Sequence, residues 1–130
     1  MIWVLVVDDD APTRETLRLA LEEAGYVALE AKDGSQALDI LRRTRRRLVA
    51  LIDLLMPEVT GMDLLREVAR ERGLARRHRY IAMTAGDDLL AQSVADTLAT
   101  LDGQLLLKPF GIEALLAAVS LAVARRPASE

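Results

Sequence analysis

The chain has 130 residues, an apolar content of 52% and a formal net charge of −3. This length and apolar share fit one globular domain with a buried core and exclude a disordered chain. The absence of cysteine excludes disulfides and thiolate metal sites, and no apolar run approaches the roughly 20 residues that span a bilayer. The small acidic charge argues against bulk nucleic-acid binding, so we expect a cytoplasmic domain that binds neither membrane nor nucleic acid directly.

Short apolar runs alternate with longer amphipathic stretches. Continuous apolar runs are typical of strands buried on both faces, and apolar residues spaced by three and four indicate helices. The predicted strands cover 2–7, 26–31, 48–52, 80–83 and 105–107. The first predicted helix starts at Pro12 and stops at Gly25, and the second covers 37–41 and ends in the basic run 42–47. The third covers 62–69. The fourth begins at a cap, Asp87 or Asp88, and continues through 98, and the fifth covers 112–123.

The order strand–helix, repeated five times, indicates a parallel sheet with helices on both faces. Five units are too few for an eight-stranded barrel. We therefore predict an α/β fold with an open, doubly wound parallel sheet. One domain is expected over 1–125, and residues 126–130 are expected to be a tail or the start of a linker.

Polar side chains directly follow four of the five predicted strands. They are Asp8, Asp9 and Asp10 after the first strand, Asp53 after the third, Thr84 after the fourth and Lys108 after the fifth. These positions should meet in space, because ligands of open α/β sheets bind beyond the carboxyl ends of the strands. Clustered carboxylates repel unless their pKa values rise or a cation binds among them. Oxygen ligands favour Mg²⁺, Mn²⁺ or Ca²⁺, and a carboxylate beside such an ion can attack a phosphoryl group.

Four stretches of the chain resemble the receiver domain of two-component response regulators. They are "VLVVDDD" (4–10), "LIDLLMPEVTGMDLL" (51–65), "IAMTAG" (81–86) and "LLLKPF" (105–110), with the spacing that this family has. The resemblance covers essentially the whole chain. It implies a five-stranded sheet of the flavodoxin-like order 2-1-3-4-5.

The resemblance implies a phosphoacceptor and a Mg²⁺ site. Asp53 is expected to accept the phosphoryl group and to contact the metal, and Asp8 and Asp9 to position Mg²⁺. The backbone carbonyl of Leu55 is expected to be a further ligand. Mn²⁺ is expected to substitute for Mg²⁺.

The resemblance also implies partners for the phosphoryl oxygens. Thr84 is expected to supply a hydroxyl and Lys108 an ammonium group, with a cis peptide bond between Lys108 and Pro109. The preference of this chain for arginine supports a special role for Lys108, because Lys32 is its only other lysine.

The function implied is a switch rather than a conventional enzyme. A histidine kinase or histidine phosphotransfer protein would donate phosphate to Asp53, and the domain would catalyse only this transfer and a slow hydrolysis. Phosphorylation would change a surface made by the fourth helix, fifth strand and fifth helix. That surface would contact an effector domain or a second copy of the chain.

Two departures from the family lie near this surface. Receiver domains usually carry Tyr or Phe three residues before the lysine, where this chain has Leu105. The usual Gly-Ala turn before the fifth strand is replaced by "TLDGQ" (100–104). We therefore expect phosphorylation to be relayed through a modified surface.

Structural interpretations are preferred for four other features. Asp10 is expected to cap the first helix rather than bind metal, and His78 to lie solvated in a polar connection. The basic run 42–47 is expected to be a solvated helix end. Phe110 is expected to pack in the core.

Two rival functions remain open at the level of sequence. The first is a pseudo-receiver that is never phosphorylated and acts by dimerisation or docking, for which Leu105 leaves room. The second is an aspartate-nucleophile phosphatase, since Asp8 and Asp10 have the D-x-D spacing of such enzymes. The chain is too short for the cap domain that a phosphatase of this kind would need.

Overall fold

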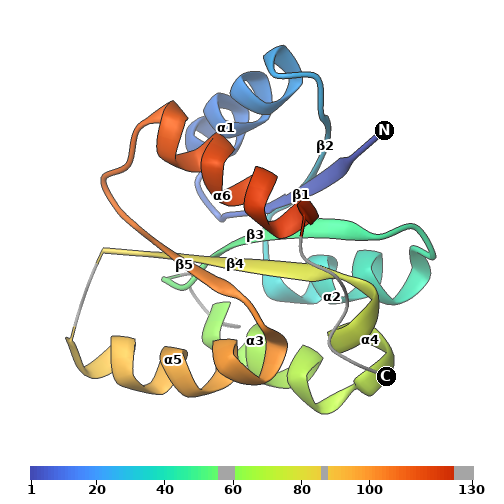
Figure 1. Ribbon diagram of the computed structural model, residues 1–130, viewed down its shortest axis with the longest axis vertical. Helices are drawn as coiled ribbons and strands as arrows, with labels where there is room; N and C mark the ends of the chain where they lie inside the picture. Colours follow the sequence, from blue (N-terminus) through green and yellow to red (C-terminus); the bar gives the residue numbers. More distant parts are fainter. Residues whose placement is uncertain (56–60, 86–87, 125–130) are drawn as a thin grey trace.

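The computed structural model describes residues 1–55, 61–85 and 88–124. Five strands form one parallel sheet of order β2-β1-β3-β4-β5, as expected (Figure 1). The strands are β1 (Trp3–Val7), β2 (Val27–Ala31), β3 (Leu48–Asp53), β4 (Arg79–Thr84) and β5 (Gln104–Leu107). The helices are α1 (Ala11–Glu23), α2 (Gly34–Arg43), α3 (Gly61–Arg70), α4 (Arg72–Arg77), α5 (Asp88–Leu101) and α6 (Ile112–Ala124). Within the described residues, no helix has the length and apolarity needed to cross a membrane.

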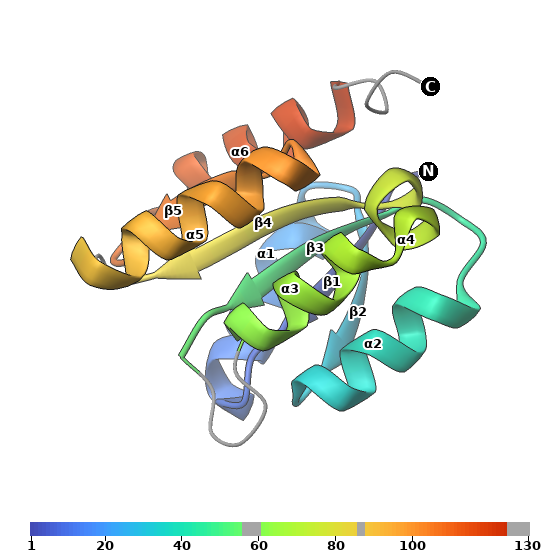
Figure 2. The same cartoon turned by 90° about the horizontal axis from the view of Figure 1, so that it is seen from below.

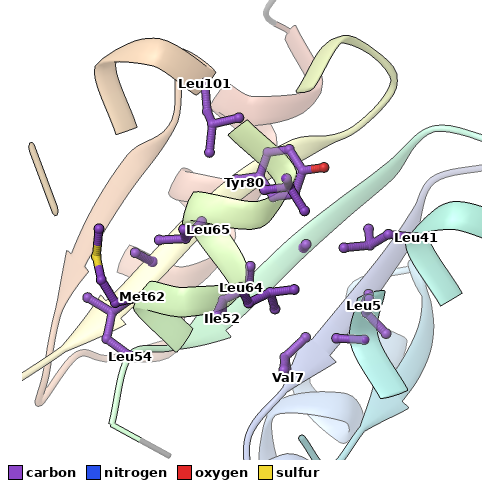
Figure 3. Packing of buried hydrophobic residues seen from close by; sticks show 14 of the residues in the cluster. Leu5, Val7, Leu41, Ile52, Leu54, Met62, Leu64, Leu65, Tyr80 and Leu101 are labelled. Atoms are coloured by element: carbon purple, nitrogen blue, oxygen red, sulfur yellow. The ribbon is translucent and has the colours of Figure 1, made fainter. Parts of the chain in front are cut away.

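The sheet is the middle of three layers (Figures 1 and 2). Helices α1 and α6 cover one face, where Leu17 and Val119 pack with residues of β1, β3 and β4. Helices α2 to α5 cover the other, where Leu41, Leu65 and Tyr80 belong to a second cluster (Figure 3). Burial of the central strands on both faces explains their unbroken apolar sequences.

Strand register brings the ends of the central strands to one edge of the sheet. Val7 lies beside Ile52, and Asp53 lies beside Met83. The residues that follow β1, β3 and β4 are therefore neighbours although they are far apart in sequence. This arrangement positions the candidate site.

Capping residues and glycines mark several helix ends and one turn. Asp10 caps α1 by accepting a hydrogen bond from the backbone of Thr13, as expected. Gly25 ends this segment with φ of 98°, a value that glycine adopts without strain. Asp33 is the N-cap of α2, because its side chain accepts a hydrogen bond from the backbone N–H of Gln36. Asp102, with φ of 53°, and Gly103 form the expected turn before β5.

Two predictions about the segment before β4 were wrong. A sixth helix, α4, occupies residues expected to be an irregular connection. His78 is fully buried instead of solvated, and its ring nitrogens lie 3.0 Å from Leu48 N and 2.9 Å from the carbonyl oxygen of Leu41. Tertiary contacts thus override the polar character of this stretch. The basic run, by contrast, is exposed at Arg45, Arg46 and Arg47, as expected for a solvated segment.

Candidate functional site

Three carboxylates meet at the carboxyl edge of the sheet. Oxygens of Asp8, Asp9 and Asp53 lie within 4.8 Å of one another. Asp8 and Asp53 are only 1% and 6% exposed, while Asp9 faces solvent. The sequence prediction that these residues converge therefore agrees with the geometry. Their assignment as metal ligands remains a prediction.

The two carboxylate oxygens of Asp8 differ in their hydrogen bonding. Its Oδ1 accepts a hydrogen bond of 3.0 Å from the backbone N–H of Asp10. Its Oδ2 is buried and accepts no hydrogen bond within the described part of the chain. Burial raises the pKa of the Asp8 carboxyl, and the charges of Asp53 and Asp9 raise it further, against the lowering effects of the Asp10 amide and Lys108. A cation among these oxygens would satisfy Oδ2 and offset the repulsion, so the residues present fit a hard divalent ion.

Lys108 supplies the positive charge of the site. Its Nζ lies 3.5 Å from Oδ1 of Asp53 and 3.8 Å from Oδ2 of Asp8. The ammonium group therefore lies between the two buried carboxylates, where it can contact an anionic group attached to Asp53. The Lys108-Pro109 bond is cis, as expected.

The loop after β3 begins with a contact to the carboxylate of Asp53. The backbone N–H of Leu55 donates a hydrogen bond of 3.2 Å to Oδ1 of Asp53. The Leu55 side chain is exposed. The role expected for its carbonyl oxygen stays a prediction. Pro57, which belongs to the stretch 51–65 that resembles the family, lies outside the described residues.

Thr84 ends β4 beside the acidic cluster and is 2% exposed. Its carbonyl oxygen accepts a hydrogen bond of 2.7 Å from the backbone N–H of Lys108. The end of β4 is thus joined directly to the residue that carries the ammonium group. The expected role of the Thr84 hydroxyl stays a prediction.

Asp10 is separated from the cluster by its capping role. Its Oδ2 accepts hydrogen bonds from the backbone and the hydroxyl of Thr13, which lower the pKa of this carboxyl. The structural interpretation of Asp10 is therefore confirmed. The D-x-D spacing does not bring Asp10 into the group of carboxylates that includes Asp8 and Asp53.

Sequence reasoning missed Arg14, which contacts the loop that carries the acidic pair. Its Nη1 donates a hydrogen bond of 2.8 Å to the carbonyl oxygen of Asp8. The only sequence signal is its position one turn into α1, on a helix whose cap adjoins the site. Many arginines of this chain are in helices, so that signal does not single out Arg14.

Comparison with known proteins gives a consistent result. The model of the response regulator receiver domain family matches residues 4–120. The response regulator MprA of Mycobacterium tuberculosis is 37% identical over 119 residues, which are 89% of this chain and 48% of that protein. The MprA protein of Mycolicibacterium vanbaalenii gives the same identity and coverage. The chain thus spans about half the length of these curated relatives.

Solved structures show the same architecture. A response regulator receiver protein from Pseudomonas putida has a TM-score of 0.77 and 31% identity, covering 92% of this chain and 96% of that one. The receiver domain of the Francisella response regulator 1452 has a TM-score of 0.79 and 28% identity, covering 94% and 96%. Sequence, fold and site geometry therefore agree, and the chain belongs to the response regulator receiver domain family.

Proposed function

We propose that Asp53 accepts a phosphoryl group from a histidine kinase or a histidine phosphotransfer protein, in a Mg²⁺-dependent reaction in the cytoplasm. The observation that carries this proposal is the position of the Asp53 carboxylate, which is buried beside two further aspartates and 3.5 Å from the ammonium group of Lys108. A carboxylate in such surroundings is held in place for attack, and the charge on an incoming phosphoryl group has a partner.

The chemistry requires one bond to form and one to break. A carboxylate oxygen of Asp53 attacks phosphorus, the P–N bond to the donor histidine breaks, and its electron pair returns to the imidazole, which takes a proton from water. Lys108 and the Thr84 hydroxyl hold the phosphoryl oxygens through charge and hydrogen bonds. Mg²⁺, held by Asp8, Asp9, Asp53 and the Leu55 carbonyl, would supply positive charge against these oxygens, and Mn²⁺ would substitute. Water attack on the acyl phosphate would reverse the switch slowly.

Phosphorylation should change the surface formed by α5, β5 and α6, to which a partner would bind. β5 is an edge strand, and Leu105 and Leu107 on it are 39% and 55% exposed, while Ile112 of α6 is 61% exposed. Exposed apolar groups beside an unpaired strand edge favour a protein partner. We propose an effector domain or a second copy of the chain as this partner, since the relatives are about twice as long.

The acceptor is tested by incubating the chain with acetyl phosphate and Mg²⁺ and measuring its mass. One phosphoryl group should be added to the unaltered chain and none to Asp53→Asn. Asp39→Asn is the matched control, because Asp39 lies exposed on α2 in an ion pair with Arg43. Equal labelling of Asp53→Asn would refute the assignment.

The same samples distinguish the rivals. An unlabelled chain that forms a stable dimer would favour the pseudo-receiver, for which the leucine at position 105 is the supporting observation. Repeated turnover of a phosphomonoester would favour the phosphatase.

A further inference from the structure

Arg14 joins the loop that carries the acidic pair to the neighbouring strand. Its Nη1 donates a hydrogen bond of 2.8 Å to the carbonyl oxygen of Asp8, and its Nε donates one of 3.1 Å to Oε1 of Glu30 on β2. The Arg14 side chain is only 17% exposed. A guanidinium group held by two acceptors in this way has little freedom to move.

The carbonyl oxygen that Arg14 holds belongs to the peptide unit between Asp8 and Asp9. On the other side of Asp8, its backbone N–H donates a hydrogen bond of 3.2 Å to the carbonyl oxygen of Ala31. Bonds on both sides fix the direction in which the chain leaves β1. Within the described part of the chain, the Asp9 carboxylate accepts no hydrogen bond, so no side-chain partner holds it and its position depends on the backbone that carries it.

We propose that Arg14 is a positioning residue for the metal site, a role that rests on the proposed function of Asp53. Arg14 orients the Asp8–Asp9 peptide, and through it the Asp9 carboxylate, so that three carboxylates face one cation. It contacts neither the cation nor the phosphoryl group. Groups that orient metal ligands in this way typically change metal affinity 10- to 100-fold when they are removed.

Charge and positioning predict opposite effects of removing Arg14. A cation near the acidic cluster repels Mg²⁺, so loss of its charge alone would tighten Mg²⁺ binding. Loss of the hydrogen bond to the Asp8 carbonyl would instead release the Asp9 backbone and weaken binding. The direction of the change in Mg²⁺ affinity therefore shows whether Arg14 acts through its charge or by positioning the Asp8–Asp9 peptide.

The experiment measures Mg²⁺ binding to the unphosphorylated chain by isothermal titration calorimetry. Arg14→Gln should raise the Mg²⁺ dissociation constant about tenfold. Arg18→Gln is the matched control, because Arg18 lies on the same helix and pairs with Glu30 at 3.0 Å and with Glu22 at 2.9 Å. It loses the same charge without touching Asp8, so its Mg²⁺ affinity should stay close to that of the unaltered chain. The Mg²⁺ dissociation constant of Arg14→Lys should lie between those of the unaltered chain and Arg14→Gln. An ammonium group keeps the charge but lacks the planar fork of nitrogens that reaches both acceptors.

A second readout separates metal affinity from a general loss of folding. In labelling with acetyl phosphate, Arg14→Gln should need about tenfold more Mg²⁺ for half of the maximal rate and should approach the normal rate when Mg²⁺ saturates. Unchanged or tighter Mg²⁺ binding by Arg14→Gln would overturn the positioning role. If Arg14→Gln does not fold, Arg14→Lys decides, and Mg²⁺ binding equal to that of the unaltered chain would overturn the role. An unaltered chain that neither binds Mg²⁺ nor takes phosphate would overturn the proposed function itself.

Discussion

His78 joins three segments at the end of the sheet opposite Asp53. It lies between α4 and β4, and its ring accepts a hydrogen bond from the backbone N–H of Leu48 through Nδ1. With Nδ1 as acceptor, the neutral ring carries its hydrogen on Nε2, which donates to the carbonyl oxygen of Leu41. Protonation would place a second hydrogen where Leu48 N–H must donate. The imidazole is therefore a neutral structural link.

Stability should fall as His78 becomes protonated. Burial lowers the pKa of this imidazole below its usual 6.5, and the charges of Arg77, Arg47 and Arg79 add to the effect, against the Leu41 carbonyl. Below pH 6.5 the unfolded chain therefore binds more protons than the folded chain. The stability that neutral His78 contributes is complete above pH 6.5. It is lost as the pH falls from 6.5 toward the pKa of His78 in the folded chain. We expect His78→Ala to lower the free energy of unfolding by about 3 kcal/mol at neutral pH, because it leaves two buried backbone groups unpaired. The difference in the free energy of unfolding between His78→Ala and the unaltered chain should become smaller as the pH falls.

Urea unfolding at several pH values measures this difference. Because His78 is the only histidine, its ring resonances in NMR also give the folded pKa directly. An imidazole that titrates at or above 6.5 would contradict the prediction. The sequence interpretation was wrong because the polar residues of this run bond to backbone carbonyls: Arg77 bonds to Thr44, and Arg79, which is 4% exposed, bonds to Arg76 and His78. Sequence alone does not show which polar residues of such a run turn inward.

At the level of elements, Gly61 sets how closely α3 approaches the end of β3. A methyl group added at Gly61 would lie 2.7 Å from Cα of Leu54 and closer still to the carbonyl oxygen of Asp53. These are backbone atoms at the end of β3 and of the residue after it, which cannot move aside as a flexible side chain would. Close contact between α3 and the backbone of Asp53 and Leu54 therefore requires glycine here.

We expect Gly61→Ala to push α3 away from β3, lower the free energy of unfolding by about 1–3 kcal/mol and slow the labelling of Asp53. Gly73→Ala is the control, because no atom lies within 4 Å of the added methyl group in α4. Alanine should stabilise that helix by about 0.5–1 kcal/mol. Thermal unfolding and the rate of labelling by acetyl phosphate measure both effects. Normal stability and labelling of Gly61→Ala would show that the two elements can separate without cost.

The sequence predicted nearly every element because most are long or strongly apolar. The five strand positions agree to within one or two residues with the structure. The exception is α4, which has six residues and one buried side chain, Leu74. A helix this short shows no apolar period, so its formation depends on packing against neighbours rather than on its own pattern.

At the scale of the molecule, parallel topology explains why the site could be predicted. Strands that all point one way place Asp8, Asp53 and Lys108 at one edge, and this follows from element order alone. The contact between Arg14 and the Asp8 carbonyl does not follow from it, because a side chain reaching a backbone oxygen depends on the exact approach of α1. The sequence therefore predicts which groups converge, and the structure adds which groups hold them.

The same topology connects the proposed acceptor site to the surface of α5, β5 and α6. The backbone N–H of Lys108 donates to the carbonyl oxygen of Thr84, so the end of β4 is joined through the backbone to the residue that follows β5. Gln104, at the start of β5, donates a hydrogen bond of 3.1 Å to the carbonyl oxygen of Ala118 on α6. Leu105, where most receivers carry an aromatic ring, follows Gln104 in the same strand. A relay through the backbone of β5 requires no ring.

We expect Mg²⁺ with beryllofluoride, a phosphoryl mimic, to change amide hydrogen exchange in β5 and in α5 or α6, because these elements are joined to Thr84 and Lys108. Helix α2, which lies beside β1 and β2, should exchange at an unchanged rate and serves as the internal reference. Asp53→Asn, which lacks the acceptor carboxylate, should show no change in any of these elements. A chain that binds the mimic while exchange stays constant from Thr84 to the end of α6 would exclude this relay. A change confined to the loops around Asp53 and Thr84 would likewise exclude it, since the phosphoryl charge would then act only locally.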